Sequence, residues 1–156
     1  MSSRIVSSIT SSGAGCNYYF VIVGQADNPV FELEYSTRGE KGRDVDHRYL
    51  SQFIAHAAMD LLDESMRHVS RMFQPSVDKF NEWHVSAFVG GCSRTKLLLV
   101  HDNTSKSDDS SIKSFMEQVY DLYCKFALNP LYEHHTPIRS VVFDRKVQTL
   151  AKKYLP

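Results

Sequence analysis

The sequence predicts an α+β fold in which helices pack on an antiparallel sheet. A chain of 156 residues with 42% hydrophobic content is long enough for one core and short for two domains. Short strand-like runs follow one another through turn signals, which is typical of antiparallel pairing. Longer segments with apolar residues every three or four positions predict amphipathic helices. The expected order is strand, strand, helix, three strands, helix, helix.

The first two strands are predicted at residues 17–24 and 30–35. The run NYYFVIVG is rich in aromatic and β-branched residues and contains no charge, which favours a strand buried on both faces. In VFELEY, Val30, Glu32 and Glu34 lie on one side, and Phe31, Leu33 and Tyr35 lie on the other. This period of two indicates a half-solvated strand. A tight turn through 27–29 is expected to join the two strands.

A long helix is predicted from about His47, after a polar loop at 36–46, with Asp46 as its N-cap. Its apolar residues recur at helical spacing, so they are expected to form the stripe that faces the core. The stripe consists of Leu50, Phe53, Ile54, Ala57 and Leu61, with Met66 after it.

The second half predicts three strands, at 77–81, 83–89 and 96–101, and two helices. Gly90 and Gly91 between the last two strands tolerate positive φ, which favours an antiparallel hairpin. A helix over 110–127 is expected to be capped by Ser107 or Asp108 and to bury Ile112, Phe115, Met116, Val119, Tyr123 and Phe126. The last helix has the apolar stripe Phe143, Val147, Leu150 and Tyr154.

Composition excludes several classes of function. Eighteen basic and eighteen acidic residues give no net charge, so no overall field favours nucleic acid or anionic lipid. No apolar run approaches the roughly 20 residues of a membrane span. Three scattered cysteines, Cys16, Cys92 and Cys124, are typical of a reducing compartment. Residues 1–15 are interpreted as a flexible serine-rich extension without a secretory signal, and 16–156 as a single domain.

The stretch IAHAAMDLLDE, residues 54–64, concentrates polar groups on the predicted first helix. Because a helix turns about 100° per residue, His56, Asp60 and Asp63 lie on one side, away from the predicted stripe, with Glu64 beside Asp60. One hypothesis is a metal-dependent hydrolase that uses His56, Asp60 and Glu64. The segment lacks the paired histidines of the helical zinc-protease motif, so no metal or cofactor is predicted.

A protein-docking role fits this helix better than catalysis. Ala57, Ala58 and Met59 adjoin Asp60, and a small apolar surface around an acid lets a partner approach and present Arg or Lys to the carboxylate. His56, Asp60, Asp63 and Glu64 are therefore the predicted partner-binding residues.

Two further groups of residues raise alternatives. His101 and Asp102 resemble a base and its orienting carboxylate, but no nucleophile elbow of the form G-x-S-x-G accompanies them. The basic side of the last helix suggests a free-standing membrane-surface module as a second rival function. Its residues are Arg145, Lys146, Lys152 and Lys153, with Arg139 just before them.

Seven ordered blocks of the sequence closely resemble the sedlin family, small subunits of the transport protein particle (TRAPP) vesicle-tethering complex. They span nearly all of 17–155. The blocks are YYFVIVG (18–24), DNPVFELE (27–34), DHRYLSQFIAHAAMDLLDE (46–64), VDKFNEWHVSAFV (77–89), LLLVHD (97–102), VYDLYCKFALNPLYE (119–133) and PIRSVVFDRKVQTLAKKYL (137–155).

This resemblance implies a longin-like (SNARE-like) fold, a five-stranded antiparallel sheet with one helix on one face and two on the other. It also implies a non-enzymatic adaptor that acts in endoplasmic reticulum to Golgi and Golgi transport. The expected partners are other TRAPP subunits and, indirectly, a Rab-type small GTPase that the assembly activates. The expected location is cytoplasmic, peripheral at those membranes. Asp60 matches an acid of the family, so the resemblance implies a partner contact for Asp60.

Overall fold

A computed structural model describes residues 17–37, 45–91, 94–102 and 108–155, and for 45–48 the backbone alone. The predicted order of elements is confirmed. The predicted extension at 1–15, and Cys16, Cys92 and Ser107, lie outside the described residues. The elements are β1 (Asn17–Val23), β2 (Pro29–Ser36), α1 (Val45–His68), β3 (Phe73–Phe80), β4 (Trp83–Val89), β5 (Lys96–Asp102), α2 (Asp109–Ala127) and α3 (Val141–Tyr154).

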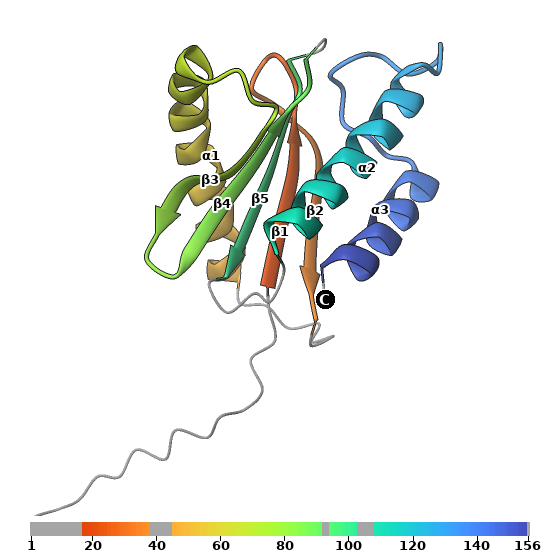
Figure 1. Cartoon of the computed structure of the whole chain (residues 1–156). Helices are drawn as coiled ribbons and strands as arrows, with labels where there is room; N and C mark the ends of the chain where they lie inside the picture. The colour runs from red at the N-terminus through yellow and green to blue at the C-terminus, as the bar shows by residue number, and fades with distance from the viewer. Residues whose placement is uncertain (1–16, 38–44, 92–93, 103–107, 156) are drawn as a thin grey trace, which may run out of the picture.

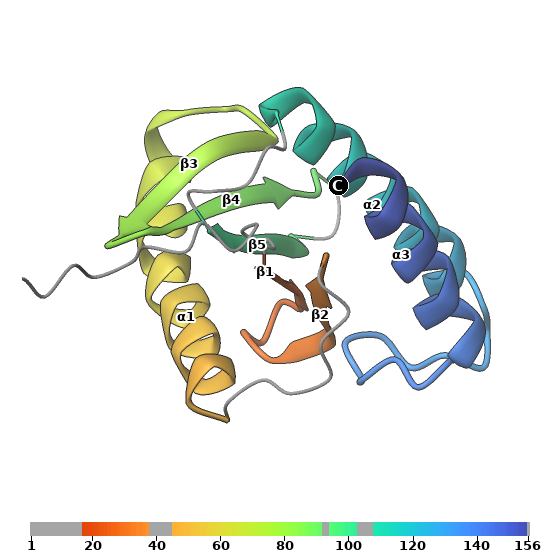
Figure 2. The same ribbon diagram turned by 90° about the horizontal axis from the view of Figure 1, so that it is seen from below.

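The strands form one antiparallel sheet in the order β2-β1-β5-β4-β3, as the longin-like fold requires. Figures 1 and 2 show α1 on one face of the sheet and α2 with α3 on the other. The central strands β1 and β5 therefore bury both faces, which explains their unbroken apolar runs. Successive side chains alternate between two cores, so that Leu97 and Leu99 face α2 and α3 while Leu98 faces α1.

The third strand begins at Phe73, four residues before the predicted start at Val77. The prediction failed because the pairing with β4 is irregular between Gln74 and Asp78, and an irregular strand loses the alternating pattern. Pro75 lies in that irregular part, where an edge strand tolerates a residue without an N–H. The Ser86 hydroxyl donates a hydrogen bond of 2.8 Å to the Pro75 carbonyl and holds the bulge against β4.

Glycine at the β4–β5 hairpin has a different reason from the one predicted. Neither Gly90 nor Gly91 has a φ in the left-handed region, whereas Arg94 does, at 48°. A Cβ on Gly90 would overlap the ring of Tyr120 on α2, while a Cβ on Gly91 would meet nothing within 4 Å. Gly90 is therefore needed for close packing of the hairpin against α2.

The predicted core stripe of α1 is wrong in part. Phe53 and Leu61 are 64% and 42% exposed, and Ala57 and Met66 are also exposed. The face that packs on the sheet is turned by about one residue from the predicted stripe, and its side chains are smaller on average. It consists of Ser51, Ile54, Ala55, Ala58, Met59 and Leu62.

The start of α1 also differs from the prediction. The helix begins at Val45, so Asp46 lies in its first turn instead of capping it.

The helices on the opposite face follow the predicted stripes. Five of the six predicted α2 residues are buried, and Phe126 is partly buried against the same core. Asp108 is the N-cap residue of α2, although its side chain makes no capping hydrogen bond. In α3 the predicted Phe143 and Val147 are buried together with Ala151, and Leu150 and Tyr154 pack partly against them. The Ser140 hydroxyl caps this helix by accepting from Phe143 N at 3.4 Å.

Candidate functional site

The side of α1 turned away from the sheet carries a mixed aromatic and acidic surface. Because a helix advances about 100° per residue, positions 49, 53, 56, 57, 60 and 64 share this side. Tyr49 and Phe53 are each 64% exposed, and the other four are also exposed. We call this surface the outer face of α1. It comprises Tyr49, Phe53, His56, Ala57, Asp60 and Glu64.

Asp60 lies at the middle of the outer face. In the part of the chain that the structure describes, no hydrogen bond or ion pair engages its carboxylate. Ala57 lies one turn away and is exposed, which fits a surface beside Asp60 but not the predicted core stripe, and Ala58 and Met59 are buried against the sheet. The apolar surroundings of this helix surface therefore come from Phe53 and Tyr49, which sequence reasoning had assigned to the core or passed over.

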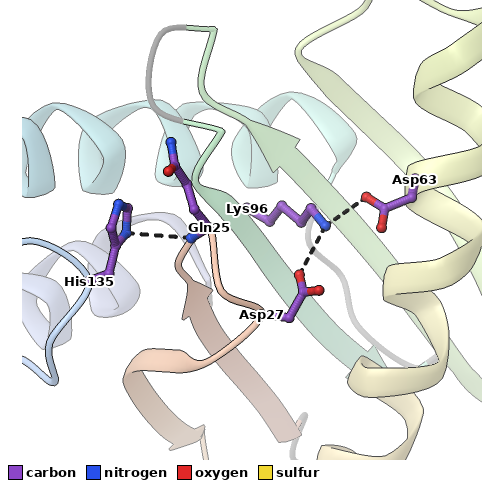
Figure 3. Close-up of polar contacts among 5 residues, drawn as sticks. All are labelled: Gln25, Asp27, Asp63, Lys96 and His135. Atoms are coloured by element: carbon purple, nitrogen blue, oxygen red, sulfur yellow. Dashed lines mark hydrogen bonds and ion pairs between the residues drawn. The ribbon is translucent and has the colours of Figure 1, made fainter.

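Asp63 is in a different situation from Asp60. Lys96 at the start of β5 places its Nζ 2.6 Å from Asp63 Oδ1 and 3.4 Å from Asp27 Oδ1 (Figure 3). The lysine side chain is 11% exposed, so it bridges the end of α1 and the β1–β2 turn from a largely buried position. The structure gives Asp63 this intramolecular role, and its predicted contact with a partner stays a prediction.

The same β1–β2 turn is tied to the opposite helical layer. Gln25 N donates to His135 Nδ1 at 3.4 Å (Figure 3). Asn28 Nδ2 donates to the His135 carbonyl at 2.7 Å. His135 belongs to the α2–α3 loop and has a positive φ of 64°. The β1–β2 turn thus connects the two helical layers at one end of the sheet.

The hydrolase hypothesis receives no support from this geometry. Among the described residues, no group of three or more His, Cys, Asp or Glu side chains is arranged to hold a metal ion. His56, Asp60 and Glu64 share one helix surface and are exposed in the described part of the chain. A metal site needs ligands that converge from several directions and some shielding from water.

His101 has a serine beside it that sequence reasoning missed. Ser86 Oγ lies 3.2 Å from His101 Nε2, because Ser86 pairs with Leu99, two residues before His101 on β5, so the two side chains share one face of the sheet. Ser86 is fully buried, and its hydroxyl proton is donated to Pro75. A serine in this state cannot attack a substrate, so the pair is structural.

Burial is the largest influence on the pKa of His101 and lowers it, followed by a backbone hydrogen bond with Asp102 that acts in the opposite direction. The ring is stacked on His84 at a centroid distance of 5.8 Å. Burial therefore favours the neutral form of His101, which lies partly buried at the end of the sheet near α2.

The membrane-surface hypothesis is also not supported. Phe143, Val147 and Ala151, the apolar side of α3, are buried against the sheet and α2, so this side is unavailable to lipid. Within the described ranges, no helix combines the length and the apolar character needed to cross a bilayer.

The sheet order and the helices on both faces define a longin-like domain, and its described residues assemble no catalytic centre. Comparisons with known proteins specify the family. The model of the Sedlin family matches residues 22–153, and the chain belongs to this family.

Curated relatives cover most of the chain. A probable trafficking protein particle complex subunit 2 of Drosophila melanogaster is 47% identical over 88% of this chain and 96% of its own length. The corresponding protein of Caenorhabditis elegans is 39% identical over 88% of this chain and 96% of its own length. The transport protein particle 20 kDa subunit of Schizosaccharomyces pombe is 36% identical over 88% of this chain and 98% of its own length.

Proposed function

We propose that this protein is a non-enzymatic adaptor subunit of a TRAPP-type vesicle-tethering complex. Its role is to join other subunits of that complex in endoplasmic reticulum to Golgi and Golgi transport, and so to contribute to assembly of a Rab exchange factor. Association with membranes is peripheral and occurs through the complex. The family membership and the names of the relatives support the assignment of this chain as a subunit of such a complex.

The outer face of α1 is the observation that carries the docking role. Two exposed aromatic side chains and an unengaged carboxylate share one rigid helix, and large exposed apolar groups beside polar ones are typical of protein interfaces. Asp60 is the proposed electrostatic contact, with His56 and Glu64 beside it. Asp63 lies at the margin, and a partner there would have to compete with Lys96.

Substitution of Asp60 by tyrosine tests this proposal. Asp60→Tyr is expected to abolish co-purification with a neighbouring subunit, because it removes the charge and adds bulk where the partner would lie. The melting temperature should stay within a few degrees, since exposed substitutions usually change stability by less than about 0.5 kcal/mol.

Glu117→Tyr is the matched control, because Glu117 is an exposed acid in the middle of α2, on the opposite layer. It should leave co-purification intact. Loss of folding in Asp60→Tyr would show that Asp60 is structural, and unchanged co-purification would exclude the outer face as the docking site.

A further inference from the structure

A groove runs beside the outer face of α1 and deepens it toward the sheet. It lies between the first half of α1 and the β1–β2 hairpin and has a volume of about 410 Å³. Here α1 packs over β1, β3, β4 and β5, and β2 forms the sheet edge next to β1. The floor is apolar and includes Val21, Leu98 and Met59.

The two walls of the groove differ in chemistry. On the helix side stand Tyr49 and Phe53, the same exposed aromatic residues that belong to the outer face. On the hairpin side stand the exposed acids Asp27 and Glu32. Glu32 accepts a hydrogen bond of 3.1 Å from Tyr19 OH, which fixes the carboxylate beside the groove.

The charge of this region is one-sided. No lysine or arginine is among the described residues that line the groove, whereas Asp27 and Glu32 line it and Asp60 lies next to it on α1. Lys96 offsets part of the charge of Asp27 from 3.4 Å. An apolar floor beside an acidic wall attracts basic groups and favours burial of an apolar side chain.

We propose that this groove receives a segment of a neighbouring TRAPP subunit in which a large apolar side chain is flanked by arginine or lysine. The apolar side chain would lie on the floor beside Phe53, and the basic side chains would face Glu32 and Asp60. This inference rests on the proposed docking role of the outer face, with which the groove shares both aromatic residues. Aromatic residues that border a pocket are typical energetic centres of protein interfaces.

Site-specific cross-linking tests the occupant directly. The full chain would carry the photo-reactive residue p-benzoylphenylalanine at Gln52, a half-buried groove position on α1. It would replace subunit 2 in the purified recombinant complex of Drosophila melanogaster, whose subunit is 47% identical. After irradiation, mass spectrometry of the cross-linked peptide should identify a segment with a large apolar residue within about one helical turn of Arg or Lys.

Affinity for that partner subunit supplies the second measurement. Phe53→Ala and Glu32→Lys should each weaken binding by about tenfold or more, and a charge reversal at the partner's basic residue should restore binding to Glu32→Lys. Phe80→Ala on β3 and Glu82→Lys in the β3–β4 turn are matched controls and should leave the affinity unchanged, because both residues are exposed at the opposite sheet edge.

The outcomes separate this inference from the proposed function. If the complex assembles and Asp60→Tyr disrupts it, but cross-linking gives no product or an acidic segment, the groove proposal is overturned and the docking role stands. If the wild-type chain does not enter the complex, both fail. A lipid or other small molecule bound to the purified chain in native mass spectrometry, and retained on assembly, would also overturn the groove proposal.

Discussion

The two helical layers of this domain use their apolar residues differently. On one face, α2 and α3 bury the stripes that their sequences predict. On the other face, α1 buries a stripe of smaller residues and leaves Tyr49, Phe53 and Leu61 exposed. This helix has more apolar residues than the sheet can cover, so some of them lie on its exposed outer face, which also carries Asp60. The difference separates a helix that only covers the core from one that also presents a surface.

A pair of adjacent leucines gives the largest expected contrast. Leu62 is fully buried, and Leu61 is 42% exposed on the same helix. Leu62→Ala should lower the free energy of unfolding by about 2–5 kcal/mol, because it leaves a cavity in the core beneath α1. Leu61→Ala removes the same atoms but should cost about 0.5 kcal/mol or less. Urea denaturation of both variants measures the contrast, and equal losses would show that the described orientation of α1 is wrong.

Two adjacent glycines of the β4–β5 hairpin make the corresponding comparison on the side of the sheet that α2 covers. Gly90→Ala should cost about 1–3 kcal/mol, because its Cβ would overlap the ring of Tyr120 and force that side chain to shift. Gly91→Ala should be nearly neutral, since its Cβ would meet nothing within 4 Å. Thermal unfolding of both variants tests this, and a stabilised Gly90→Ala protein would show that the hairpin does not pack closely on α2.

Removal of the Lys96 amine is expected to have a smaller effect. Lys96→Met keeps most of the buried stem and loses the ion pairs to Asp27 and Asp63. Both carboxylates are about half exposed and can be hydrated, so the cost should be about 1 kcal/mol or less.

Lys113→Met on α2 is the control, because its pair with Glu117 is 3.9 Å long and exposed on both sides. Calorimetry at low and high salt compares the two variants. If Lys96→Met costs no more than Lys113→Met at low salt, the bridge between α1 and the hairpin does not contribute to stability.

Sequence patterns predicted most of this fold because they record burial. The charge-free runs of β1 and β5 and the stripes of α2 and α3 are consequences of having a covered face. The pattern failed where burial alone did not decide the sequence: at Pro75, where an edge bulge breaks the alternation, and on α1, where both sides carry apolar residues. Leu61 and Leu62 are one position apart, and periodicity cannot choose between them when either choice completes a stripe.

The candidate site was predictable to a similar extent. Helical spacing placed His56, Asp60 and Glu64 on an exposed side, and the structure agrees. It had no means of finding the Lys96 bridge to Asp63 or the groove beside Phe53, since these depend on residues from strands that are distant in the sequence. A lysine at the start of a buried strand was the available signal, because a buried amine requires a nearby acid.

The smallest expected effect concerns pH and the end of the sheet near α2. Since burial lowers the pKa of His101 below the ordinary 6.5, the folded protein binds fewer protons than the unfolded chain just below that pH. The contribution of neutral His101 to stability is therefore present above pH 6.5. It is lost as the pH falls from 6.5 through the lower pKa of the folded state. The groups around the ring are His84, Asp102 and Asp109; the histidine acts in the same direction as burial and both acids act against it.

Substitution of His101 by glutamine should flatten the decline of melting temperature between pH 7 and pH 5, because the residue no longer gains a proton on unfolding. The exposed His134 on the α2–α3 loop is the matched control, and His134→Gln should keep the wild-type slope. A wild-type slope in His101→Gln would mean that acid sensitivity arises elsewhere. A steeper slope would mean that His101 is protonated in the folded protein, so that the imidazole stabilises the β4–β5 end as a cation beside Asp102 and Asp109.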